Sequence, residues 1–178
     1  MRLATMTTPP GFAMNFPPPS ETTGIPPNDQ GWDDWLRPFA DNPRSSGDRP
    51  LVASRDLPPE VESPGIARNV TKATLVRWSL GEFYDDAAVV VSELVTNAIR
   101  YGLRPDVRYP LRLVLVRYER QLVCMVTDPA DTAPMMREPD WVAETGRGLH
   151  IIEAISRAWG WTPLLQGGKA VWASFSII

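Results

Sequence analysis

The sequence predicts an α+β fold of two layers, in which three helices cover one face of a mixed, mostly antiparallel sheet. First, strongly β-prone runs occur in pairs joined by very short connections, at residues 111–128 and 161–177, as in antiparallel hairpins. Second, apolar residues recur at helical spacing over residues 63–81, 85–102 and 149–160. The order along the chain is therefore β-α-α-β-β-loop-α-β-β. Helices with one apolar stripe bury it against a sheet, so a layer of helices on one sheet follows.

Composition limits the classes of protein to consider. A length of 178 residues with 43% hydrophobic residues is enough for one sizeable core and an appendage. The net charge of -3 provides no basic surface for nucleic acid. No run of about 18 apolar residues and no signal-peptide core occurs. The sole cysteine, Cys124, lies in an apolar run and excludes a disulfide framework. We expect a soluble, cytoplasmic protein that binds neither nucleic acid directly nor a membrane.

The first part of the chain is rich in proline. Thirteen of the nineteen prolines fall at or before Pro64, where they oppose both helix and sheet. We therefore predict a disordered tail over residues 1–48 and a folded domain over residues 49–178. The tail contains four apolar residues at helical spacing, namely Trp32, Trp35, Leu36 and Phe39. This segment either binds a partner, folds back onto the domain or has no role of its own.

The folded part is expected to begin with a strand and a helix. The alternating run LVASRDL at 51–57 predicts an edge strand that ends at Pro58. Ser63 before Pro64 has the N-cap and N1 arrangement of a helix start. The apolar spacing that follows carries this first helix to about Gly81.

The second helix contains the stretch VVVSELVTNAIRYG at 89–102. Asp85 or Asp86 is expected to cap its start, and Gly102 its end. A broad apolar arc leaves one narrow polar seam, in which Glu93 and Asn97 lie one turn apart. The other polar residues of the seam are Thr96 and Arg100. By itself this pair is more often a solvent-exposed helix face than a site.

The second half of the chain alternates hairpins with a long loop. The runs LRLVLVRYE and QLVCMVTD form a hairpin whose second strand ends at Asp128. Residues 129–145 contain three prolines and no period, which predicts a loop, and long loops inside compact domains are usually functional. The loop leads to Gly146-Arg147-Gly148-Leu149, where a third helix begins and runs to about Gly160. A last hairpin, WTPLL and KAVWASFSI joined by QGG, closes the chain.

Taken together, these features resemble the GHKL ATPase superfamily, which has the Bergerat fold. Within it they resemble the small bacterial anti-sigma factor serine/threonine kinases. The stretch SELVTNAIRYG is similar to the N box of the family, and ETGRGLHII to its glycine box and the following helix. The segment WGW…GGKAVWASF is similar to the closing hairpin. The resemblance spans roughly residues 50–178 and implies a histidine kinase-like ATPase domain that binds ATP and Mg²⁺.

The resemblance implies a role for three polar side chains. Asn97 would be the Mg²⁺ ligand, which suits a hard ion that takes one or two protein oxygens together with phosphate oxygens. Glu93 would orient or deprotonate the attacking hydroxyl as a general base. Asp128 would accept a hydrogen bond from the exocyclic amine of adenine.

The resemblance also implies a phosphate site at the start of the third helix. Gly146 and Gly148 would let backbone N–H groups approach the phosphates, next to Leu149, at a helix N-terminus that favours anions. Arg147 between the two glycines could add a charge-assisted contact.

The sequence departs from the family pattern at two places. The family has Asp-x-Gly-x-Gly in its first glycine box, whereas Asp128 is followed by PADTAP. Many relatives have Gly-Thr before the last strand, whereas this chain has Gly168-Lys169. Lys169 is interpreted as a simple turn charge.

Three functional hypotheses follow. The first is an ATP- and Mg²⁺-dependent protein kinase that sequesters a sigma factor and phosphorylates an anti-sigma antagonist. The second is a non-catalytic, protein-binding regulator on the same fold, with nucleotide as a structural ligand or absent. The third, the catalytic domain of a two-component histidine kinase, is disfavoured because no phosphoacceptor helix precedes residue 50. The sequence leaves the oligomeric state open, a homodimer included.

Overall fold

The computed structural model describes residues 50–103, 111–136, 146–164 and 167–177. The elements are β1 (Leu51–Leu57), α2 (Ser63–Arg77), the 3₁₀ helix η2 (Gly81–Phe83), α3 (Tyr84–Tyr101), β2 (Leu111–Tyr118), β3 (Gln121–Asp128), α4 (Gly148–Ile155), β4 (Ala158–Pro163) and β5 (Lys169–Ser176). This is the predicted order with one short 3₁₀ helix added. The predicted tail over residues 1–48, with its tryptophan segment, lies outside the described residues.

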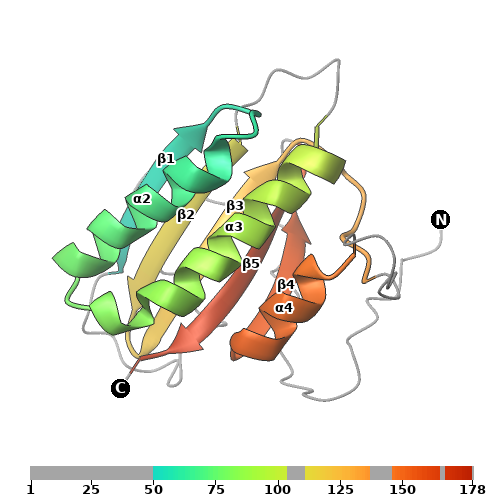
Figure 1. Cartoon of the computed structure of the whole chain (residues 1–178). Coiled ribbons are helices and arrows are strands. Elements are labelled where there is room, and N and C mark those ends of the chain that lie inside the picture. Colours follow the sequence, from blue (N-terminus) through green and yellow to red (C-terminus); the bar gives the residue numbers. More distant parts are fainter. Residues whose placement is uncertain (1–49, 104–110, 137–145, 165–166, 178) are drawn as a thin grey trace.

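The strands form one five-stranded sheet in the order β1-β2-β3-β5-β4. Each of its four neighbouring pairs is antiparallel. Figure 1 shows α2, α3 and α4 side by side on one face of this sheet. The predicted two-layer α+β architecture is therefore confirmed, and the sheet, predicted as mixed and mostly antiparallel, is antiparallel throughout. Within the described residues, no helix is long and apolar enough to cross a membrane.

The main core lies between α3 and the sheet. Period-two alternation points Leu111, Leu113 and Leu115 of β2 toward the helices, and all three are fully buried. From α3 the apolar arc contributes Val90 and Leu94. The helix therefore crosses the middle of the sheet, and its polar seam is turned toward α4.

The opposite face of the sheet is apolar too. Val116, Val123 and Met125 are fully buried there, in a second cluster that Trp172 packs against. Cys124 points to the helix side and is buried, as expected, and burial raises the pKa of its thiol to about 12. Both faces of β2 and β3 are thus buried.

The start of the first helix differs from the prediction. Ser63 is the first residue of α2, not its N-cap, and Glu62 flanks it without a side-chain cap. The Ser63 hydroxyl instead donates a hydrogen bond to the Pro58 carbonyl oxygen, 2.5 Å away. This bond ties the helix start to the end of β1. Pro64 lies in the first turn, as predicted.

The end of the same helix comes earlier than predicted. The helix ends at Arg77, not at Gly81. Ser79 takes a left-handed conformation with φ 57°, and the Leu80 N–H reaches back to the Leu75 carbonyl oxygen at 2.8 Å. This is a Schellman ending, which glycine usually forms and which serine forms here. The sequence signal for glycine was therefore misleading.

The predicted caps of α3 are half right. Neither Asp85 nor Asp86 caps the helix, because it begins one residue earlier at Tyr84, directly after the 3₁₀ turn. Both aspartates lie in its first turn, where the helix dipole favours negative charge. Gly102 is the C-cap, as predicted, but with φ -99° it is not left-handed.

The last helix is also shorter than predicted. It ends at Ile155 because Ser156 is extended, and the Ser156 hydroxyl donates to the Ile152 carbonyl oxygen at 2.6 Å. Gly160, the predicted helix end, lies within β4. A Cβ at Gly160 would come within 2.7 Å of the Trp172 indole on the neighbouring strand. Glycine is needed there to accommodate a cross-strand tryptophan.

Candidate functional site

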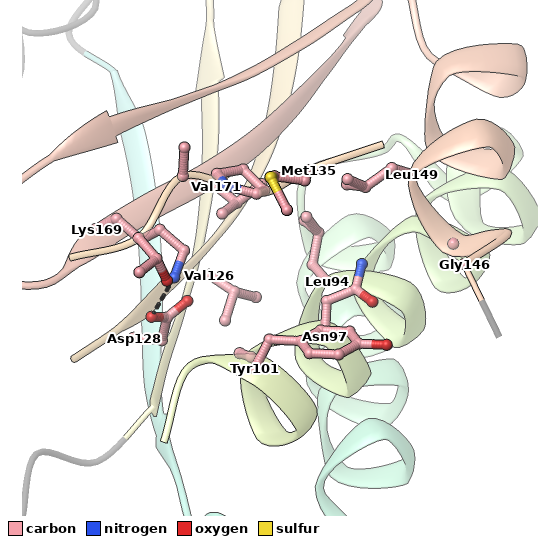
Figure 2. Close-up of a pocket in the computed structure, with 15 residues that line it drawn as sticks. Leu94, Asn97, Tyr101, Val126, Asp128, Met135, Gly146, Leu149, Lys169 and Val171 are labelled. Carbon is pink, nitrogen blue, oxygen red and sulfur yellow. Dashed lines mark hydrogen bonds and ion pairs between the residues drawn. The ribbon is translucent and has the colours of Figure 1, made fainter. Parts of the chain in front are cut away.

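A pocket of about 510 Å³ opens between α3, β3, β5 and the start of α4. Its walls are mainly apolar, and polar groups lie at its sides (Figure 2). Five of the predicted site residues line it, namely Asn97, Asp128, Gly146, Gly148 and Leu149. Segments that are distant in the sequence thus meet around one cavity.

The polar seam of α3 forms one side of this site. Glu93 and Asn97 are both partly buried, whereas Arg100, one turn further along, is exposed. Desolvation by burial raises the pKa of the Glu93 carboxyl, and the charge of Arg100 partly opposes this. Glu93 therefore has the kind of shift that makes a carboxylate a better proton acceptor near neutral pH.

The start of α4 lies directly against this seam. A Cβ on Gly148 would come within 2.6 Å of Glu93 Oε2 and 3.2 Å of Asn97 Nδ2. Only a glycine lets the helix approach so closely without displacing a side chain. The carboxylate, the amide and the helix N-terminus are consequently held next to one another.

The N-terminus of α4 borders the pocket through Gly146, Gly148 and Leu149. Gly146 has φ 92°, a conformation that glycine adopts readily, and Arg147 precedes the helix without a side-chain cap. The first N–H groups of a helix have no partner within the helix and attract negative charge. Arg147 is exposed and is not among the residues that line the pocket. The two glycines are thus part of the pocket, whereas Arg147 flanks it.

A buried ion pair lies on another side of the pocket. Lys169 Nζ donates to Asp128 Oδ1 at 2.7 Å, and the two residues are only 4% and 5% exposed (Figure 2). Asp128 Oδ1 also accepts from the Ala130 N–H at 2.9 Å, and Lys169 Nζ donates to the Ala130 carbonyl oxygen at 3.2 Å. Desolvation raises the pKa of Asp128 on balance, although the bond to Lys169, its charge and the Ala130 N–H all act to lower it.

The interpretation of Lys169 as a turn charge is therefore wrong. Lys169 is the first residue of β5 and the antiparallel partner of Asp128, the last residue of β3. Opposite charges directly across such a pair attract each other. Aligning the two predicted strands so that their ends match would have revealed this contact. Without the register, a lysine after two glycines looks like part of an exposed turn.

Glycines surround the Asp128 side chain and backbone. A Cβ on Gly102 would come within 2.5 Å of Asp128 Cγ, which explains a glycine there despite its ordinary φ. Gly168 has φ 82°, and a Cβ there would collide with the Asp128 carbonyl oxygen. The end of α3 and the last hairpin thus both close tightly around Asp128.

The segment after Asp128 lacks the glycines of the family pattern and is linked to the last hairpin by a hydrogen bond. Asp131 Oδ1 accepts a hydrogen bond from the Gly168 N–H at 2.7 Å, which ties this segment to the last hairpin. Beyond it, Thr132, Pro134 and Met135 line the pocket. Sequence reasoning missed these residues because a loop without a period gives no signal of direction. It also missed Tyr101, the last residue of α3, which lines the pocket. Residues 137–145 of the predicted loop lie outside the described residues.

The described residues contain no cluster of the side chains that usually bind a metal ion on their own. Nowhere in those ranges do three or more His, Cys, Asp or Glu residues gather as a metal site would need. Asn97 nevertheless fits Mg²⁺, which takes few protein oxygens when phosphates supply the others, and it lies beside an anion-favouring helix start. The described residues therefore fit Mg²⁺ with a nucleotide better than Mg²⁺ alone.

Comparison with known proteins concerns the fold and the family of the chain. No curated protein matches the chain. Among solved structures, the RsbU and RsbW domains of Rv1364c from Mycobacterium tuberculosis match with a TM-score of 0.53 and 16% identity. The match covers 71% of this chain and 32% of the other, so this chain spans about a third of that structure's length. At this identity the likeness concerns the fold. The family model for the histidine kinase-like ATPase domain matches residues 57–175, and the chain therefore belongs to that family.

Proposed function

We propose that the chain is an ATP-binding regulator that acts as an anti-sigma-factor-like serine/threonine protein kinase. The observation that carries the proposal is that one pocket brings together a buried carboxylate, Asp128, the amide of Asn97 and the start of α4. Membership of the histidine kinase-like ATPase domain family supports nucleotide binding at this place.

The nucleotide base would occupy the apolar part of the pocket. Leu94, Ala98, Val126 and Val171 offer apolar contacts to a flat ring. Asp128 would accept a hydrogen bond from the exocyclic amine of adenine with its second oxygen, since the first is held by Lys169. A few polar groups in an otherwise apolar cavity is the usual basis of orientation in small-molecule sites.

The phosphates would lie at the start of α4. Gly146 and Gly148 allow the phosphates to approach the backbone, and the first N–H groups of a helix, which have no partner within the helix, favour their charge. Asn97 would hold Mg²⁺ with its amide oxygen. When bound, Mg²⁺ neutralises phosphate charge during transfer. Arg147 would add its positive charge from the rim of the pocket.

Glu93 would act on the attacking hydroxyl of a protein serine or threonine. Its raised pKa, caused by desolvation, suits proton acceptance, and its carboxylate lies against Gly148 at the phosphate side. Asn97 and the helix N-terminus would fix the phosphates while Glu93 orients the hydroxyl for attack. Phosphoryl transfer depends mainly on such positioning and on charge stabilisation.

The partners follow from the resemblance to anti-sigma factor kinases. The chain would sequester a sigma factor and phosphorylate an anti-sigma antagonist protein. The likeness to a structure that contains RsbU and RsbW domains supports this choice at the level of the fold. A homodimer is compatible with the proposal.

Transfer to protein is tested with labelled ATP, Mg²⁺ and purified candidate antagonists. We expect wild-type protein to label one antagonist on serine or threonine, and Glu93→Gln to keep ATP affinity while losing label. Equal labelling by Glu93→Gln would remove Glu93 from the role of base. Binding of ATP with no transfer to any antagonist would exclude the kinase.

One observation favours the second candidate, a non-catalytic regulator. The Asp128–Lys169 ion pair occupies one oxygen of the carboxylate proposed to read the base, and the glycines expected after Asp128 are absent. Weak nucleotide binding without turnover, combined with retained binding of a sigma factor, would support this candidate over the kinase.

A further inference from the structure

We infer that Lys169 broadens the base specificity of the pocket, so that it accepts purines with an oxygen at ring position 6, such as guanine, besides those with an amine, such as adenine. This inference rests on the proposed function, because it concerns the base that the same pocket would take. It departs from a site in which the aspartate alone reads the base.

Two charged side chains line the side of the pocket where the base would lie. Among the described residues that line the pocket, Asp128 and Lys169 are the only charged ones. Figure 2 shows this pair at the opposite side of the pocket from Gly146 and Leu149 at the start of α4. A nucleotide whose phosphates lie at the helix would therefore present the edge of its base to the pair.

The pair has hydrogen-bonding capacity left over. A lysine ammonium has three donors, and two are used here, on Asp128 Oδ1 at 2.7 Å and on the Ala130 carbonyl oxygen at 3.2 Å. The hydrogen bonds to the Asp128 carboxylate from described residues all go to Oδ1. The pair thus leaves one N–H donor next to one acceptor oxygen, Oδ2.

The edges of both purines present a donor next to an acceptor, but in opposite order, so the two bases would use the Lys169 donor and Asp128 Oδ2 in exchanged places. Adenine offers its exocyclic amine next to the acceptor N1, and guanine offers N1–H next to the acceptor O6. An aspartate alone accepts from the amine of adenine but repels O6 of guanine. Because the Lys169 ammonium can donate to that oxygen, the main cause of guanine rejection is removed.

Burial strengthens the influence of Lys169 on which base the pocket binds. Lys169 is 4% exposed, so water cannot readily take the place of its ammonium group as a hydrogen-bond donor to the edge of the base. Sites with buried polar groups discriminate sharply between ligands that satisfy those groups and ligands that leave them unpaired. The charge at residue 169 should consequently determine the ratio of the affinities for the two purine nucleotides.

The test measures binding of Mg²⁺–ADP and Mg²⁺–GDP to the full chain by calorimetry, in wild type and in Lys169→Thr. The diphosphates avoid turnover, and threonine provides the hydroxyl that many relatives have at this place. For wild type we expect dissociation constants within about tenfold of each other. In Lys169→Thr the affinity for GDP should fall by at least about tenfold relative to ADP. Lys72→Thr, which changes an exposed lysine on α2, is the matched control and should keep the wild-type ratio.

Wild type alone is sufficient to overturn the inference, even if Lys169→Thr does not fold. Binding of ADP more than about a hundredfold tighter than GDP by the wild type would refute it. An unchanged ratio in folded Lys169→Thr would refute it as well. If the wild type binds neither nucleotide, the proposed function itself fails and this inference fails with it, which distinguishes the two cases.

Discussion

Glu93 lies where stability and function oppose each other. Burial raises the pKa of its carboxyl, so folded Glu93 holds its proton more tightly than unfolded Glu93 does. The stability it contributes is complete below the unfolded pKa, about 4.3, and is lost as the pH rises through the raised folded value. Above the raised folded pKa, the ionised side chain therefore destabilises the fold.

Glu93→Gln is accordingly expected to be more stable than wild type at pH 7 and equally stable at pH 3.5. The neutral amide avoids the cost of burying a charge at pH 7, whereas both side chains are neutral in acid. Urea denaturation at the two pH values measures the difference. Glu82→Gln, at an exposed glutamate of η2, is the control and should show no such pH dependence. A Glu93→Gln protein that is less stable than wild type at pH 7 would contradict this.

Thr71 is fully buried in α2, and its hydroxyl has no hydrogen-bond partner within the described structure. Thr71→Val keeps the shape and removes the unsatisfied group, so it should stabilise the protein by about 1 kcal/mol. Thr71→Ser, which keeps the hydroxyl and loses the methyl group, should be less stable than wild type. Thermal unfolding of both variants measures this. If valine is the less stable of the two, the hydroxyl has a partner after all.

Part of the site could be predicted from the types and spacing of its residues, whereas the rest depends on the register of the strands. Asn97, Asp128 and the glycines at 146 and 148 could be found in the sequence because their chemistry and spacing resemble a family, and the structure brings them to one pocket. Their roles remain predictions. Lys169 could not be assigned from its type alone, because its contact with Asp128 depends on how β5 aligns with β3.

The approach of α4 to α3 depends on glycine at position 148. In Gly148→Ala the added methyl group meets Glu93 Oε2, the end of a flexible side chain, which can move aside. We therefore expect unfolding free energy within about 0.5 kcal/mol of wild type, but a loss of phosphoryl transfer because Glu93 is displaced. Denaturation and transfer assays measure the two effects. Gly81→Ala, where a Cβ meets nothing within 4 Å, should change neither.

Gly168→Ala provides the opposite case on the last hairpin. Its φ of 82° is unfavourable for alanine, and the methyl group meets the Asp128 carbonyl oxygen, which is backbone. We expect a loss of stability of about 2 kcal/mol or more, measured by the same denaturation. Gly148→Ala losing more stability than Gly168→Ala would show that the contact of α4 with α3 is not relieved by a side-chain movement.

The elements were predicted better than their ends. Periodicity found α2, α3 and α4, because each buries an apolar stripe on the sheet. It could not locate the ends of α2 and α4. The chain leaves these helices at Ser79 and Ser156, with backbone hydrogen bonds that cannot be predicted from a serine in the sequence. The helix ends were predicted at Gly81 and Gly160, because glycine often ends a helix, but Gly81 lies in η2 and Gly160 in β4.

One core connects the helices to the sheet, so the described part of the chain should unfold as one unit. Leu115 is fully buried between them and does not line the pocket. Leu115→Ala should lower the unfolding free energy by about 2–5 kcal/mol in a single transition, without changing nucleotide affinity well below the melting temperature. Val76→Ala, at a side chain that is 66% exposed, should change stability by less than about 0.5 kcal/mol. Two separate transitions in urea would contradict a single core.

At the scale of the molecule, element order and hairpin spacing were sufficient to predict the architecture. Short connections between β2 and β3 and between β4 and β5 favour antiparallel pairing, and the structure places the three α-helices on one face of the sheet (Figure 1). The position of β5 between β3 and β4 was not predicted, because the residues of a strand do not reveal whether it lies at the edge of the sheet.

We propose that this pocket binds a nucleotide with Mg²⁺ held through Asn97. Calorimetric titration of ATP with Mg²⁺ into wild type and Asn97→Ala tests it most directly. We predict that wild type binds and that Asn97→Ala, with its fold intact by circular dichroism, binds about 10- to 100-fold more weakly. No heat from wild type at millimolar ATP, or equal affinity in the two proteins, would contradict the claim.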